Sequence, residues 1–104
     1  MLNLLKKLFG AGRSVKFKEL TEEGARIVDV RTVAEFNTDH IKDAVNVPLD
    51  TISKELHMIK KINKPVIAVC RSGKRSSVAV DIFKKAGIEA YNGGAWNVLK
   101  SKIA

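Results

Sequence analysis

The chain has 104 residues, a length that suits one domain around one core and is too short for two ordinary domains. Hydrophobic residues make up 45% and charged residues 29%, which is a globular composition, and the apolar runs are too short for a transmembrane segment. The formal net charge is +8, but the cations are scattered and not interleaved with aromatic residues, so we expect no nucleic-acid partner. Small anionic substrates or an acidic protein partner fit the positive charge equally well.

The chain contains one cysteine, Cys70, and two histidines, His40 and His57. A single cysteine excludes an internal disulfide, a CxxC redox pair and a multi-cysteine zinc site. The two histidines have no ligand-like spacing to each other or to Cys70, so we expect no structural metal. Because a free thiol suits a reducing compartment, we expect a cytoplasmic protein.

Residues 1–13, MLNLLKKLFGAGR, are predicted to form a basic amphipathic segment ahead of a single domain over residues 14–104. Lys6 and Lys7 interrupt the leucines, so the segment lacks the continuous apolar stretch and the clear cleavage site of a signal peptide. A short helix that contacts a membrane surface is one interpretation. A first helix or tail that rests on the domain is the preferred one.

Short strands and helices are expected to alternate along the first half of the domain. Residues 15–24 are predicted to start as a short strand and become a helix that Gly24 ends. They are followed by a buried strand at 26–30, a short helix or turn at 32–40, and a strand at 43–49 that Pro48 stops.

The second half continues the alternation. Asp50 is a candidate N-cap for a helix over residues 51–62, and residues 66–69, VIAV, are typical of a central parallel strand covered on both faces. A helix is expected to begin near Ser76, with Ser76 or Ser77 as its cap, and to end at Gly87. A strand at 88–91 and a glycine turn at 93–94 then lead to a last helix. This order predicts an α/β fold with a small, mostly parallel central sheet and helices on both faces.

The segment CRSGKRS, residues 70–76, falls between the apolar strand and the next helix. Such a loop lies at the carboxyl edge of a parallel sheet, where open α/β folds bind ligands. The first N–H groups of the helix lack partners and favour an anion, and Gly73 allows the backbone to curl around it. Arg71, Lys74 and Arg75 add positive charge. We therefore expect a lowered pKa for the Cys70 thiol and a nucleophilic thiolate. The alternative is a buried free cysteine that packs as a small hydrophobic residue, but it does not explain the glycine and three cations that follow.

The segment CRSGKRSSVAVDIFKKAG resembles the active-site segment of rhodanese-like domains, which has a cysteine, a basic or polar residue, a glycine, a basic residue, a serine and then a helix. RIVDVRTVAEFNTDHIKDAVNVPL is similar to the family's Asp-Val-Arg, Glu-Phe, Gly-His-Ile and Asn-Ile-Pro stretch. AYNGGAWNV is similar to its late Gly-Gly and Trp turn, although Trp96 stands early. The chain has Asp39-His40 and Asp43-Ala44 where the family usually has glycine first, which changes the backbone of a turn more than the chemistry.

The resemblance implies a single-domain sulfurtransferase of the thiosulfate sulfurtransferase family. A small anionic donor such as thiosulfate would give its outer sulfur to Cys70, and the Cys70 persulfide would pass it to cyanide or to a thiol or protein acceptor. No cofactor is implied, because the sulfur is carried covalently. The residues implied to bind the substrate are Arg71, Ser72, Gly73, Lys74, Arg75 and Ser76.

The other polar residues of the matching segments have mainly structural interpretations. Asp29 is expected to pair with a cation of the loop, and Arg31 is expected to pair with Glu35. His40 is expected to hydrogen-bond backbone in a turn, and Trp96 to pack near the loop.

A binding module, a cysteine phosphatase and an arsenate reductase are the alternative functions. A non-catalytic binding module of the same family is the first alternative, although Cys70 and its loop are intact. A cysteine phosphatase needs Cys-x5-Arg, whereas here the arginine, Arg75, comes one position earlier and Ser76 stands in its place. An arsenate reductase would need a second, resolving cysteine. The oligomeric state and the physiological donor and acceptor stay open.

Overall fold

The computed structural model describes residues 15–104, so the predicted segment 1–13 lies outside the described residues. In chain order the elements are helix α2 (Phe17–Glu22), strand β1 (Arg26–Asp29), helix α3 (Val33–Thr38), strand β2 (Val45–Asn46), the 3-10 turn η1 (Leu49–Thr51), helix α4 (Ile52–Ile62), strand β3 (Val66–Cys70), helix α5 (Lys74–Lys85), strand β4 (Ala90–Ala95) and helix α6 (Trp96–Ile103). None of the helices in this part of the chain has the length and apolar character needed to cross a membrane.

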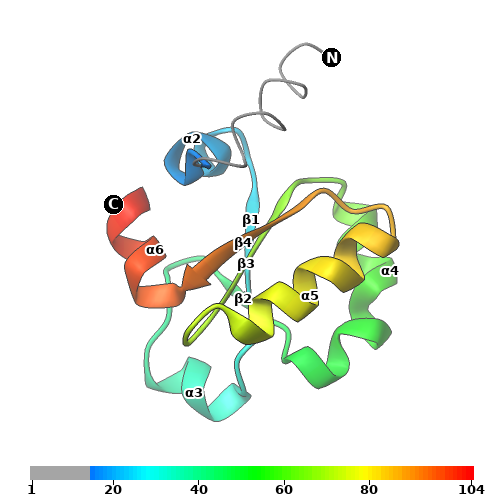
Figure 1. The fold of residues 1–104 in the computed structure, drawn as a ribbon, viewed down its shortest axis with the longest axis horizontal. Coiled ribbons are helices and arrows are strands. Elements are labelled where there is room, and N and C mark those ends of the chain that lie inside the picture. Colours follow the sequence, from blue (N-terminus) through cyan, green and yellow to red (C-terminus); the bar gives the residue numbers. More distant parts are fainter. Residues whose placement is uncertain (1–14) are drawn as a thin grey trace.

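The strands form one four-stranded sheet in the order β2-β1-β3-β4, and every pairing is parallel. Successive strands are joined through helices (Figure 1). Helices α4 and α5 pack on the sheet, whereas α3, between β1 and β2, contributes no buried residue. The sequence VIAVC of β3 is buried at every position, which suits a strand that has a neighbour on each side and helices above and below. The predicted α/β fold with a parallel central sheet is confirmed.

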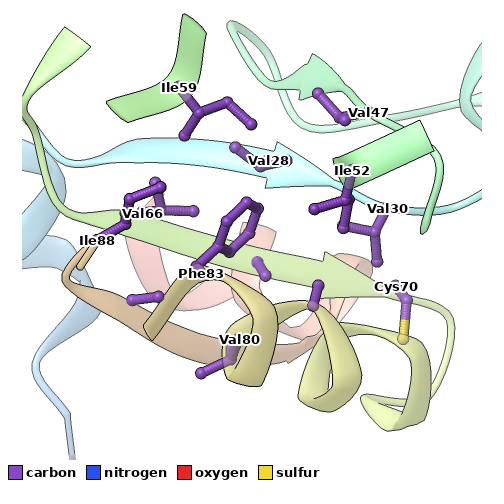
Figure 2. Packing of buried hydrophobic residues seen from close by; sticks show 13 residues of the cluster. Val28, Val30, Val47, Ile52, Ile59, Val66, Cys70, Val80, Phe83 and Ile88 are labelled. Atoms are coloured by element: carbon purple, nitrogen blue, oxygen red, sulfur yellow. The ribbon is translucent and has the colours of Figure 1, made fainter. Parts of the chain in front are cut away.

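Alternate residues of β3 point into two separate cores. Val66, Ala68 and Cys70 belong to a cluster that α4 and α5 cover, with Phe83 at its centre (Figure 2). Ile67 and Val69 face the other side, where α2 and α6 contribute Leu20 and Leu99. The predicted placement of helices on both faces is therefore also confirmed.

The predicted capping residues of both helices in the second half are wrong, although the helix expected over 51–62 is present. Asp50 lies in η1, and the N-cap of α4 is Thr51, which makes no side-chain capping bond. Helix α5 begins earlier than expected, at Lys74, with Gly73 as its N-cap, so Ser76 is inside the helix. The reason is that Gly73 adopts a left-handed conformation, with a φ of 99°, and turns the chain directly into the helix.

The last strand also differs from the prediction. Gly93 and Gly94 belong to β4 and do not form a separate turn, and the strand begins at Ala90. Gly93 is the additional residue where the register between β3 and β4 shifts: Ala68 pairs with Asn92, but Val69 pairs with Gly94. The short strand predicted just before α2 is not formed at residues 15–16.

Candidate active site

Cys70 is the last residue of β3, at the carboxyl edge of the sheet, and its side chain lies on the face that α5 covers. Figure 2 shows its sulfur beside the loop and the first turn of α5. The residue has no solvent-exposed surface. Residues 71–73 then lead into α5, so the strand end, the glycine turn and the helix start meet at the sulfur as the sequence predicts.

The Cys70 sulfur receives several hydrogen bonds. The Gly73 N–H donates to Sγ with an N–S distance of 3.0 Å, and the Ser76 N–H lies 3.5 Å from it. The Ser76 Oγ is also 3.5 Å from Sγ. Burial raises the pKa of the Cys70 thiol, but the Ser76 hydroxyl and the N–H groups of Ser76, Ser72 and Gly73 lower it by more, so the net pKa is below its ordinary value. The expected lowering is confirmed, with hydrogen bonds as its main cause.

Asn92 of β4 is a member of this site that the sequence analysis missed. Its Oδ1 accepts from the Ser76 hydroxyl at 2.6 Å and from the Gly94 N–H at 2.9 Å. Its Nδ2 donates to the Gly73 carbonyl oxygen at 3.0 Å. One amide therefore connects the loop, the first turn of α5 and the end of β4. The signal in the sequence was the Gly93-Gly94 pair, which indicates that this segment lies close to the cysteine loop. Nothing in the neighbouring sequence indicates that the side chain of Asn92 contacts that loop.

The three cations of the loop have different surroundings. Arg75 forms a bidentate ion pair with Glu35 of α3, with N–O distances of 2.7 and 3.0 Å. Arg71 and Lys74 are exposed, and neither contacts a carboxylate within residues 15–104. The pair lowers the pKa of Glu35 to about 2 and raises that of Arg75.

The expected ion pairs of Asp29 and Arg31 are wrong. Asp29 does not contact a loop cation; Asp29 and Arg31 pair with each other, with an Nη2–Oδ2 distance of 2.7 Å. Both are buried, and the guanidinium also donates to the Asp39 carbonyl oxygen and lies 4.7 Å from the centre of the Trp96 ring. Glu35 does not pair with Arg31 and is instead the partner of Arg75.

His40 and Trp96 both make structural contacts, His40 with Phe36 and Trp96 with the core. The His40 ring stacks on Phe36, with 3.7 Å between ring centroids, and its Nδ1 lies 2.8 Å from the Phe36 carbonyl oxygen, as predicted for a turn residue. Trp96 packs against the core cluster on the α6 side. Within residues 15–104, no three His, Cys, Asp or Glu side chains come together as a possible metal site.

An open hollow of about 680 Å³ lies beside the loop. Its walls come from the loop, from the end of β4 and from the two terminal helices of the described chain. The residues that line it are Phe17, Ser72, Gly73, Lys74, Ser77, Asn92, Gly93, Gly94 and Lys102. The hollow leads to the loop, and Lys74 and Lys102 give its lining positive charge.

The chain is similar to several known proteins. It is 32% identical over 74 residues to the Bacillus subtilis protein named "Putative sulfur carrier protein YrkF". The aligned region covers 71% of this chain and 40% of that protein. It is 36% identical over 83 residues to "Uncharacterized protein YqhL" of the same species, covering 72% of this chain and 65% of that protein. The chain thus spans less than two thirds of the length of both relatives.

A solved structure and a family model agree with this similarity. The crystal structure of a rhodanese-like domain protein from Staphylococcus aureus has a TM-score of 0.62 and 38% identity, covering 69% of this chain and 74% of that one. The family model described as "Rhodanese-like domain" matches residues 14–99, which include both β3 and the cysteine loop that follows it. With its four parallel strands in place and Cys70 at their carboxyl edge, the chain belongs to the rhodanese-like domain family.

Proposed function

We propose that this protein is a sulfurtransferase that carries a sulfane sulfur as a persulfide on Cys70. The observation that supports this most directly is the set of hydrogen bonds to Sγ, led by the Gly73 N–H at 3.0 Å. These donors stabilise negative charge on the sulfur, which is what a nucleophilic thiolate needs. The relative named as a sulfur carrier supports the same chemistry.

The reaction is proposed in two displacement steps. In the first, the Cys70 thiolate attacks the outer sulfur of thiosulfate, the bond between the two sulfur atoms of the donor breaks, and sulfite leaves with the electron pair. In the second, cyanide or a thiolate acceptor attacks the outer sulfur of the persulfide. Thiocyanate or a new persulfide leaves, and the Cys70 thiolate is restored. The chain has one cysteine, so an external acceptor must complete the cycle.

The proposed substrate-binding residues divide into two kinds. The backbone of Ser72, Gly73 and Ser76 supplies hydrogen-bond donors to the sulfur. Arg71 and Lys74 are exposed beside the loop, where they attract an anionic donor. Arg75 is held by Glu35, so its proposed role is to anchor the first turn of α5.

Two other functions are weaker candidates. A non-catalytic binding module would not need the hydrogen-bond donors that converge on Cys70. A cysteine phosphatase would need an arginine of its loop to clamp a phosphate. Arg75 stands one position too early for that motif, and its guanidinium is occupied by Glu35.

The test is intact mass measured after incubation with thiosulfate, for the wild type and for Cys70→Ser. We expect the wild type to gain one sulfur atom, which cyanide then removes with release of thiocyanate, and the variant to gain none. A polysulfide donor is tested in parallel. If the wild type gains no sulfur from either donor, the sulfurtransferase proposal is wrong and the binding module replaces it.

A further inference from the structure

The orientation of the Asn92 side chain follows from two backbone groups. The Gly94 N–H can only donate, and it lies 2.9 Å from one amide atom of Asn92, which is therefore the oxygen. The Gly73 carbonyl can only accept, and it lies 3.0 Å from the other atom, which is therefore the nitrogen. Oδ1 is thus the atom that faces Ser76, at 2.6 Å from its Oγ.

This orientation determines where the Ser76 hydrogen lies. An amide oxygen cannot donate, so the Ser76 hydroxyl must donate to Asn92. A hydroxyl has one hydrogen, so the Ser76 oxygen faces the sulfur, 3.5 Å away, with a lone pair. That contact is favourable while Cys70 is a thiol, because the S–H can donate to the oxygen. It is unfavourable once the proton has left to solvent, because a lone pair then faces a thiolate.

We propose that the Ser76 hydroxyl has two positions, donating to Asn92 while Cys70 is a thiol and turning to the sulfur when the thiol ionises. Asn92 is then a positioning residue, which competes with the sulfur for this hydrogen. Its Oδ1 keeps the Gly94 N–H in both positions, so the amide is not left without a partner. The inference rests on the proposed function only in taking Cys70 as the nucleophile.

Burial makes this competition matter. Ser76 and Cys70 are both fully buried, so at the sulfur water does not replace a donor that turns away, whereas Asn92 is an exposed residue. The charged groups at this edge of the sheet are Arg71, Lys74, Arg75, Glu35, Asp50 and the Asp29–Arg31 pair, and Asp81, Lys84 and Lys85 lie further along α5. None of these charged groups is changed in the variants of this test, so their effect on the thiol is the same in every variant.

The test is a double-mutant cycle on the pH midpoint of Cys70 alkylation by iodoacetamide, using Ser76→Ala, Asn92→Ala and the double variant. Because the chain has one cysteine, intact mass reports its reaction alone. We expect Ser76→Ala to raise the midpoint, since a donor to the thiolate is lost. Asn92→Ala should lower it by about half a pH unit to one unit, or about three- to tenfold in alkylation rate below the midpoint. In the Ser76→Ala background the Asn92 change should have no effect.

Matched controls are Ser53→Ala and Asn97→Ala, which change exposed residues of α4 and α6 and should leave the midpoint in place. The proposal is overturned if Asn92→Ala raises the midpoint, leaves it unchanged, or shifts it equally with and without Ser76. In each case Asn92 would only brace the loop through its bond to Gly73. Alkylation needs no sulfur donor, so this result is independent of whether the persulfide forms.

A second measurement avoids the substitutions altogether, in case the buried changes prevent folding. The NMR chemical shifts of the Asn92 side-chain amide are followed in the wild type as pH is raised. We expect them to change with the same midpoint as the Cys70 β-carbon and to stay constant in Cys70→Ser. An Asn92 amide that does not respond while Cys70 titrates would contradict the two-position hydroxyl.

Discussion

Arg75 and Glu35 connect the helix that follows Cys70 to a helix 40 residues earlier in the chain, through two N–O contacts of 2.7 and 3.0 Å. The same Glu35 carboxylate accepts from the Thr32 N–H, which completes the capping box at the start of α3. A single side chain thus caps one helix and anchors the first turn of another.

Glu35→Gln should weaken this connection in a pH-dependent way. The Arg75 bond and the Thr32 N–H lower the pKa of Glu35 from 4.5 to about 2. A lowered pKa means that the stabilisation is fully present above pH 4.5 and is lost as pH falls towards 2. We expect the variant to lose about 0.5–1 kcal/mol at neutral pH, since the pair is about one-third exposed. Urea unfolding at several pH values should show the difference from wild type shrinking below pH 4.5. Glu22→Gln, at an exposed position of α2, is the control, and a difference that persists unchanged to pH 2 would contradict this account.

Arg71→Ala and Lys74→Ala should each raise the KM for thiosulfate, on the proposed function. Both cations are exposed beside the loop without a carboxylate partner in residues 15–104, so their charge is available to a dianionic donor. We expect about a threefold to tenfold increase at low salt that diminishes as salt screens the charge. Lys84→Ala, in the last turn of the same helix, tests for a general effect of net charge. Equal KM values for Lys74→Ala and Lys84→Ala would argue against a local role for Lys74.

Asp29→Asn should destabilise the fold strongly. Asp29 and Arg31 have side-chain exposures of 1% and 5%. Removing the carboxylate charge leaves a buried guanidinium without its counter-ion, which costs about 3–5 kcal/mol in comparable pairs. The free energy of unfolding in urea measures the loss, and Asp81→Asn, exposed on α5, is the matched control. A loss as small as that of the control would show that Trp96 and the Asp39 carbonyl suffice to hold Arg31.

Gly93→Ala and Gly94→Ala should differ in size and cause. A Cβ at Gly93 would lie 2.8 Å from side-chain carbons of Ile67 and Val69, inside the core beneath α6. We expect a loss of about 1–3 kcal/mol from this overpacking. At Gly94 no atom lies within 4 Å of the added Cβ, but the φ of 77° is strained for alanine, with a cost of about 1–2 kcal/mol. Thermal melts of both variants, with Gly94→Asn as a residue that tolerates this φ, separate the two causes. Recovery of stability in Gly94→Asn over Gly94→Ala is expected, and its absence would contradict the strain.

Gly73→Ala should raise the pH at which Cys70 becomes reactive. The residue has a φ of 99°, and a Cβ would lie 3.3 Å from the Gly94 Cα, so the loop must shift. The shift moves the N–H that donates to Sγ at 3.0 Å, and the thiolate loses stabilisation. We expect a midpoint about half a pH unit to one unit higher in the iodoacetamide assay. Gly87→Ala, also at a positive φ but at the other end of α5, should cost stability and leave the midpoint unchanged. Similar midpoints for both variants would mean that the Gly73 N–H has little influence on the thiol.

The features that could be predicted from the sequence are those that depend on neighbours in the chain. The uninterrupted VIAVC run predicts a central parallel strand, because only a strand covered on both faces buries every residue. A cysteine at its end, followed by a glycine and a helix, predicts hydrogen-bond donors around the sulfur, because the first N–H groups of a helix have no partners within it. The family motifs are local in the same sense, and the family follows from them.

What the tertiary structure alone decided is which side chains meet. Asp29 pairs with Arg31. Glu35 pairs with Arg75, although its position in the chain suggested Arg31 as its partner. Asn92 reaches the loop only because β4 lies beside β3 in a register that places it opposite Ala68, on the α5 face. Charged and amide groups select partners by distance and burial in three dimensions, and a one-dimensional pattern carries neither the strand register nor the position of α3 against α5.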